Sequence, residues 1–273
     1  MYSSTLDAVS EAAAKKAAYF RSHPLGYLTA AALAGVYVGF GILLAFTVGA
    51  PFAAQHAPCQ KLVMGASFAI ALSLVVFAGA ELFTGNNLAM AVGYWRRATT
   101  IKQLIMVWSA SWAGNLIGGA LLATLLFYST VLNGTAEMTL VQQAATKKML
   151  APISELLVKG ILCNWLVCLA VWCTFRMRSE AGKLIIIFWC LYAFVAAGFE
   201  HSVANMTLLS LALLQPHTAQ ISFTGFAHNL LWVTLGNAIG GMLFVGGAYQ
   251  ITDSKNTNCQ HVSGDDIPRV LQQ

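Results

Sequence analysis

Four ionisable residues lie well inside long apolar runs of this 273-residue chain: Glu81, Lys159, Glu200 and His201. Ionisable groups are costly in the core of a bilayer, so they usually face a partner or a water-filled path. We expect the two carboxylates to accept hydrogen bonds from backbone amides at helix breaks. An imidazole at position 201 could donate to an anion, lend it a proton, or do both. The alternative is a buried neutral histidine satisfied by a backbone carbonyl.

Further polar residues accompany these groups. The hydroxyl of Thr84 could orient His201 or a substrate. Asn86 and Asn205 carry amides that both donate and accept, which suits positions at helix breaks. Lys159 has two interpretations, a source of positive potential near a pore and a lysine that snorkels to the membrane interface.

The polar groups lie in an internal repeat. Residues 80–86 read AELFTGN and residues 199–205 read FEHSVAN, so both contain Glu-x4-Asn. The motifs GNLIGG at 114–119 and GNAIGG at 236–241 follow them, and we expect their glycines to serve helix packing. A unit of three spans must insert upside down the second time, which predicts an inverted repeat with broken second and fifth helices. Paired breaks of this kind mark the substrate site in channels and transporters.

The composition predicts an all-α membrane protein. The chain is 58% hydrophobic and 9% charged, whereas soluble domains carry about 25% charged residues. The basic residues are not clustered with aromatic residues, which argues against nucleic-acid binding. The cysteines form no CxxC pair, and we expect no metal and no cofactor. The apolar runs are 28–52, 62–95, 104–130, 156–175, 184–214 and 226–249.

The distribution of positive charge predicts the topology. With six spans and both termini in the cytoplasm, the inner segments hold 11 of the 15 Lys and Arg residues. The outer loops hold Lys61, Lys147 and Lys148. Residues 5–22 predict an amphipathic helix that ends before Pro24. The predicted segments are a cytoplasmic amphipathic N-terminal segment (1–27), a transmembrane channel domain (28–250, with halves about 28–130 and 156–250) and a cytoplasmic polar tail (251–273).

The sequence resembles the formate/nitrite transporter family over roughly residues 24–250. The resemblance implies an aquaporin-like fold of six spans, assembled as a homopentamer with one pore per protomer in a bacterial inner membrane. It implies a small monovalent anion as substrate, with nitrite first and formate or hydrosulfide as alternatives. The stretches that carry it are AELFTGN (80–86), KGILCNWLVCLAVW (159–172), GFEHSVANM (198–206) and HNLLWVTLGN (228–237).

The resemblance also implies roles for single residues. His201 would be the central pore histidine, and its counterpart in the first repeat is Leu82. Thr84 would face it, and Lys159 would match the lysine of the family's pore. The candidate pore or substrate residues are His201, Thr84, Lys159, Asn205 and Glu200, and Glu81 and Asn86 are candidate structural residues at the breaks. From the sequence alone, plain helix packing is favoured over a constriction for each of the candidate constriction residues, which are Phe68, Leu72, Leu82, Phe83 and Phe194.

The mechanism expected from these residues is passage as a neutral acid. Burial in an apolar zone favours the uncharged form, so a weak-acid anion would gain a proton near His201, directly or through water. The sequence also bears on two other classes of membrane protein. A water or glycerol channel is disfavoured because neither break contains Asn-Pro-Ala. An intramembrane serine protease is disfavoured because Gly65-Ala66-Ser67-Phe68 lacks a second glycine after the serine, and we expect no enzymatic activity.

Overall fold

The computed structural model describes residues 2–132 and 134–257, and this part of the chain contains helices and no strands. Of the predicted polar tail, residues 258–273 lie outside the described residues. The helices are α1 (Ser3–Ser22), α2 (Pro24–Ala54), α3 (Gln60–Phe68), α4 (Ile70–Leu74), η1 (Val75–Gly79), α5 (Phe83–Trp95), α6 (Ile101–Ser129), α7 (Thr135–Met149), α8 (Ile153–Arg176), α9 (Glu180–Ala197), α10 (Ser202–Leu214), α11 (Phe223–Ile239), η2 (Gly240–Gly247) and α12 (Ala248–Thr257), where η marks a π-helical segment.

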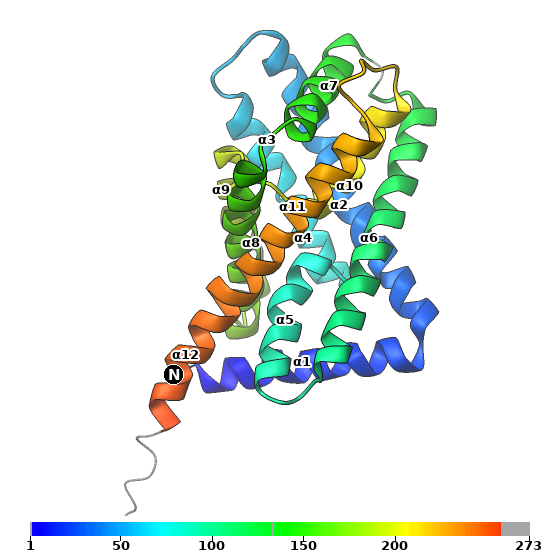
Figure 1. The fold of residues 1–273 in the computed structure, drawn as a ribbon. Helices are drawn as coiled ribbons and strands as arrows, with labels where there is room; N and C mark the ends of the chain where they lie inside the picture. The colour runs from blue at the N-terminus through cyan, green and yellow to red at the C-terminus, as the bar shows by residue number, and fades with distance from the viewer. Residues whose placement is uncertain (1, 133, 258–273) are drawn as a thin grey trace, which may run out of the picture.

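Six helical stretches of the described residues are long and apolar enough to cross a membrane, as the sequence predicts. Figure 1 shows them as a bundle, with α1 lying across one end and α7 at the other. The chain is therefore a multi-pass membrane protein. The six stretches are Pro24–Ala54, Gln60–Gly79, Ile101–Ser129, Ile153–Arg176, Glu180–Ala197 and Phe223–Asp253.

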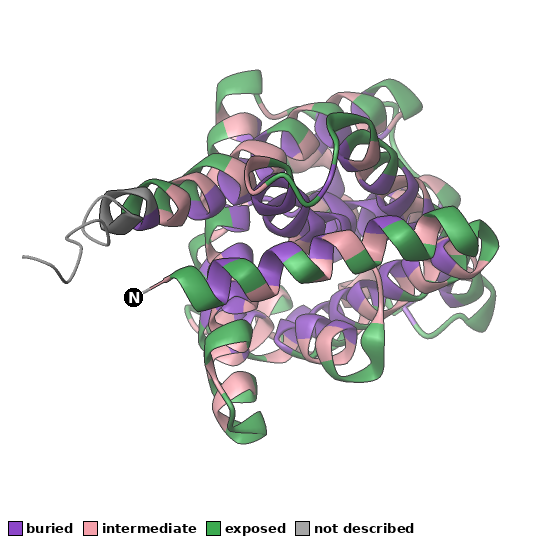
Figure 2. Ribbon diagram, turned by 90° about the horizontal axis from the view of Figure 1, so that it is seen from below, coloured by how far each residue is buried: buried purple, intermediate pink, exposed green. Residues whose placement is uncertain are grey.

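The predicted amphipathic helix is α1. Its buried face repeats every three or four residues, through Leu6, Val9, Ala13 and Ala17. Pro24 stands at the first position of α2, where its fixed φ suits a helix start, and the chain turns between the two helices. Figure 2 looks onto α1 from outside the bundle and shows its exposed residues turned away from the spans.

The second and fifth spans are broken, as predicted. Gly79 ends η1 with a φ of 80°, and Gly198 follows α9 with a φ of 76°. A positive φ is strained for residues that carry a Cβ, so glycine is the residue suited to both positions. Short extended segments follow each glycine. The chain then resumes as the half-length helices α5 and α10.

The structure extends the repeat beyond the predicted halves. The sequence did not predict α7, whose residues are too polar to form an apolar run. It precedes α8 as α1 precedes α2, and the two helices lie at opposite ends of the bundle (Figure 1). Each repeat unit therefore begins with a short surface helix, and its three spans follow.

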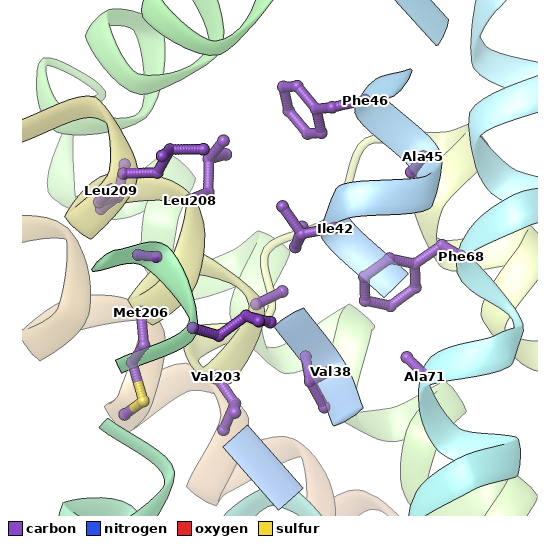
Figure 3. Close-up of a cluster of buried hydrophobic side chains, with 14 of the residues drawn as sticks. Val38, Ile42, Ala45, Phe46, Phe68, Ala71, Val203, Met206, Leu208 and Leu209 are labelled. Carbon is purple, nitrogen blue, oxygen red and sulfur yellow. The ribbon is translucent and has the colours of Figure 1, made fainter. Parts of the chain in front are cut away.

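Glycines allow the first and third spans of each unit to pack closely, as predicted for the GNxxGG motifs. A Cβ at Gly118 would overlap the carbonyl of Ala32, and one at Gly240 would overlap the carbonyl of Ile161. The apolar core lies alongside these contacts. Figure 3 shows Val38, Ile42 and Phe46 of α2 facing Phe68 on one side and the α10 residues on the other.

Candidate functional site

Two cavities approach each other in the middle of the bundle. The first, here named the α1 vestibule, has a volume of about 520 Å³ and is lined by Lys16, Glu81, Leu72 and Leu82 among others. The second, the α7 vestibule, has a volume of about 310 Å³, and its lining includes Lys148. The two vestibules lie at the ends of the bundle that their helices cover, so together they could form one route across it.

A small void of about 10 Å³ lies between the vestibules. Leu72 and Leu82 line both this void and the α1 vestibule. Phe68, Phe194 and His201 line both the void and the α7 vestibule. The structure therefore brings four of the five candidate constriction residues and the candidate pore histidine together around one narrow zone.

Aromatic rings form the wall on the α7 side of this zone. The rings of Phe68 and Phe194 meet edge to face with centroids 5.7 Å apart. The ring of His201 lies nearly parallel to that of Phe194, at 5.9 Å. The fifth candidate, Phe83, lies elsewhere: its ring packs edge-on against Trp108 at 6.3 Å, and it lines neither vestibule nor the void.

Hydrogen bonds on both ring nitrogens fix the orientation of His201, which is 5% exposed. Its Nδ1 accepts from the backbone N–H of Ala204 at 3.1 Å, which caps the start of α10. A nitrogen that accepts carries no proton, so in the neutral ring the proton resides on Nε2. Nε2 lies 3.1 Å from Oγ1 of Thr84, to which it therefore donates. Thr84 faces His201 as the sequence predicted.

The first turn of α5, which carries Thr84, is held from α8. The carbonyl of Thr84 accepts from Nδ2 of Asn164 at 3.2 Å and from Sγ of Cys168 at 3.2 Å. Both donors are fully buried. The same Nδ2 of Asn164 contacts the carbonyl of Asn237 at 2.6 Å. Asn164 thus links the first turn of α5 to the second repeat.

The carboxylates at the breaks are paired with lysines of the surface helices. Glu81 accepts from Lys16 of α1 at 2.7 Å, and Glu200 accepts from Lys148 of α7 at 2.8 Å. Each also accepts from the asparagine five residues further on. Those distances are 3.1 Å for Asn86 and 2.7 Å for Asn205.

The prediction that these carboxylates accept from freed backbone amides is wrong. Their side-chain oxygens accept from other side chains, and the asparagine of each GNxxGG motif binds the backbone instead. Oδ1 of Asn115 accepts from Phe83 N–H, and Oδ1 of Asn237 accepts from Ser202 N–H, both at 2.9 Å. An amide offers both an acceptor and donors, whereas a carboxylate only accepts. The Nδ2 groups of Asn115 and Asn237 donate to the backbone carbonyls of Glu81 and Glu200, which lie in the same breaks.

Lys159 lines the α7 vestibule, where its Nζ pairs with Glu155 at 2.5 Å. It does not line the central void. Its backbone carbonyl accepts from the N–H of Glu200 at 3.3 Å. The same vestibule is lined by the basic residues Lys61, Lys147, Lys148 and Lys159 and by the acidic residues Glu155 and Glu200. The balance of charge is positive, which favours anions.

Sequence reasoning missed Lys16 and Lys148 as site residues. Both lie in polar segments far along the chain from the carboxylates they bind, so no local spacing connects them. A comparison of the segments that precede each repeat unit would have found them. The serine of the protease alternative, Ser67, donates to the carbonyl of Val63 and lines an outer groove instead of the cavity of His201.

The model of the formate/nitrite transporter family matches residues 3–251. The chain belongs to this family. It is 41% identical over 256 residues to "Nitrite transporter NirC" of Salmonella typhimurium, with 94% of each chain covered. It is also 41% identical over 249 residues to the protein of the same name from Escherichia coli, with 91% of each chain covered.

Solved structures agree with this assignment. A chain described as "FNT family ion channel" superposes with a TM-score of 0.85 at 40% identity, and the match covers 91% of this protein and 98% of that chain. A "Pentameric formate channel with formate bound" superposes with a TM-score of 0.72 at 27% identity, covering 84% of this protein and 97% of that chain. The expected family and fold are confirmed.

Proposed function

We propose that this protein is a channel for small monovalent weak-acid anions, with nitrite as its main substrate. The observation that carries the proposal is that the two vestibules meet at the narrow zone around His201, which would give a single route across the bundle. Family membership and the nitrite transporters at 41% identity support nitrite. Formate and hydrosulfide are the alternatives, and a solved relative with formate bound favours formate as the second candidate. The channel relatives also support a role without enzymatic catalysis.

The first step of the proposed mechanism is electrostatic. The α7 vestibule carries four lysines and two glutamates, so it raises the local concentration of anions. Lys148 lies in the same vestibule as His201, and its pairing with Glu200, which also accepts from Asn205, keeps it ordered there. An anion would reach the aromatic wall with its charge still balanced by lysine ammonium groups.

The second step is the loss of charge at the narrow zone. A bare anion is unfavourable among Phe68, Leu72 and Phe194, so the neutral acid is the form that passes. His201 is a poor source of the proton, since an imidazolium would need a proton on Nδ1 and this nitrogen accepts from Ala204. Water in the vestibule is the better source. His201 instead offers its Nε2–H to the substrate, in place of the bond to Thr84.

The proposal extends to the assembly and the orientation in the membrane. We propose a homopentamer, supported by the pentameric relative and by an exposed apolar groove of about 620 Å³ that Leu44, Ile70 and Trp189 help to line. We place the protein in a bacterial inner membrane with both termini in the cytoplasm. The bundle end that carries α1, α12 and the α5–α6 and α8–α9 connections holds most of the basic residues.

The test is nitrite and formate uptake into liposomes that hold the purified protein, measured over a pH series. Flux should rise as pH falls, because the neutral acid becomes more abundant. His201→Phe removes the donor and should change the anion selectivity or the pH response, whereas His201→Asn keeps a donor and should retain more of the flux. Nitrite flux and pH response that stay unaltered in His201→Phe would overturn the proposal.

A further inference from the structure

A groove of about 360 Å³ lies between the last turn of α1 and the first turns of α6. It shares no lining residue with either vestibule, and the proposed transport mechanism does not use it. Arg21 and Lys102 supply positive charge to its lining, and Phe20, Met106 and Val107 supply apolar surface. The groove therefore combines a cationic part with an apolar part.

The two cations of the groove lack a carboxylate partner among the described residues. Two neighbouring lysines of α1 are paired: Lys15 with Glu11 at 2.7 Å, and Lys16 with Glu81 at 2.7 Å. Arg21 and Lys102 form no such pair within residues 2–132 and 134–257. Their charge is available to a ligand from outside the chain.

The surroundings of the groove identify the kind of ligand. The helix α1 lies across the end of the spans, as an amphipathic helix does at a membrane surface (Figure 2). On α6, the exposed apolar residues Ile101, Ile105 and Met106 begin beside the groove. They continue its apolar surface towards the bilayer. A ligand with a charged head and an apolar tail would contact both the cationic and the apolar parts of the groove. A free anion would leave Phe20 and Met106 without a partner.

We propose that this groove binds an anionic phospholipid, with the phosphate held by Arg21 and Lys102 and an acyl chain against Phe20 and Met106. A guanidinium can bind two phosphate oxygens at once, and the lysine adds a point charge. Basic pockets between helices at the cytoplasmic interface are typical sites for anionic headgroups. Because α1 also carries Lys16, a bound lipid would hold in place the helix that supplies the partner of Glu81.

The test is binding of short-chain phosphatidylglycerol to the delipidated full-length protein in detergent. A ligand that binds the folded state raises the midpoint of thermal unfolding, so the shift against lipid concentration reports the affinity. The groove variant is Arg21→Gln with Lys102→Gln. The control, Arg178→Gln with Lys183→Gln, removes the same formal charge from the connection between α8 and α9 and from the first turn of α9, where Lys183 pairs with Glu180. We expect half-saturation at a concentration about tenfold higher or more in the groove variant, with the control unchanged.

Two further measurements are needed. One distinguishes a lipid headgroup from free phosphate, and the other shows whether the groove variant loses binding only because it is misfolded. Short-chain phosphatidylcholine and inorganic phosphate should raise the midpoint much less than phosphatidylglycerol. The variant Arg21→Lys with Lys102→Arg keeps both charges and should bind phosphatidylglycerol within a few-fold of the wild type. The proposal is overturned if the groove and control variants respond alike, or if inorganic phosphate alone reproduces the full shift. It is also overturned if the charge-keeping variant loses binding as the groove variant does.

Discussion

The break after Gly79 and the break after Gly198 are stabilised by equivalent residues. A glycine with positive φ opens each break, and a buried asparagine of the following span binds the exposed backbone. A lysine from the preceding surface helix pairs with each glutamate. At the centre the breaks differ, because the first presents Leu82 to the narrow zone and the second presents His201.

The difference separates the scaffold from the chemistry. The groups that stabilise the breaks occur at equivalent positions in both repeat units. The histidine, Thr84 and the surplus of lysines in the α7 vestibule occur once. We therefore expect changes to the duplicated glycines and asparagines of the breaks to affect stability alike in both halves. Changes to the groups around His201, the lysines of the α7 vestibule included, should affect transport.

The largest effect should follow loss of a break asparagine. Asn115→Leu and Asn237→Leu each leave one backbone N–H and one carbonyl of a break without their amide partner, that of Glu81 or of Glu200. Each also removes a second donor from a carbonyl inside a helix, that of Ala31 or Gly160. At about 1–3 kcal/mol for each of the two stranded groups, both should lose about 2–6 kcal/mol of unfolding free energy.

Thermal unfolding in detergent measures this loss. The exposed substitution Gln143→Leu on α7 is the control and should change stability by less than about 0.5 kcal/mol. A large loss for one asparagine variant beside a small loss for the other would contradict a shared scaffold.

The next effect concerns the paired lysines. Lys148→Met leaves the buried charge of Glu200 facing the vestibule that His201 lines, so nitrite flux should fall about tenfold. Lys16→Met should reduce the flux less, because Leu72 and Leu82 separate its vestibule from His201. Liposome uptake compares the two, with Lys148→Arg and Lys16→Arg as charge-keeping controls. An equal decrease in both Met variants would mean that the vestibules contribute alike.

A smaller effect is expected for the glycines that open the breaks. A Cβ at Gly79 or Gly198 would meet no atom within 4 Å, so only the positive φ penalises alanine. Gly79→Ala and Gly198→Ala should each cost about 1–2 kcal/mol of stability. Gly85→Ala, inside α5 and without a positive φ, should be neutral or slightly stabilising. The midpoint of thermal unfolding distinguishes these outcomes.

The smallest effect is the response to salt. Anions that enter through the α7 vestibule meet four lysines, whereas those that enter through the α1 vestibule meet one lysine paired with Glu81. The Debye length falls from about 30 Å at 0.01 M to about 8 Å at 0.15 M ionic strength. Nitrite entry from the α7 side of oriented vesicles should therefore decrease a few-fold, and entry from the α1 side should change less. Equal salt dependence from both sides would remove the steering role of the lysines.

The sequence predicted the spans and the breaks because these features have local signals, whereas the repeat and the family resemblance predicted that Thr84 faces His201. Apolar runs of sufficient length identify spans, and the Glu-x4-Asn repeat identifies breaks. It missed α7, since a short polar helix at a membrane surface resembles a loop in composition. The ion pair of Lys148 with Glu200 joins residues 52 positions apart, a separation that no local pattern reports.

The role of Asn115 and Asn237 was hidden for a different reason. Glycine spacing already explained the GNxxGG motifs as packing surfaces, and the structure confirms that packing. The asparagine between the glycines has a second role that depends on which backbone groups the opposing break exposes. The sequence also could not show where the side chain of Phe83 points. Phe83 lies at the first break, but its ring packs against Trp108 instead of lining the narrow zone.

The size of the void beside His201 determines how protons can cross the membrane through this protein, and therefore how the protein affects the proton gradient that a bacterium maintains. At about 10 Å³ it is at or below the roughly 10–15 Å³ that one water molecule requires. A file of waters that could relay protons is therefore interrupted between the two vestibules. An acid molecule can pass only by displacing the side chains around it, and they close again behind it. The narrow zone would therefore limit proton movement through this protein to the one proton that each neutral acid molecule carries.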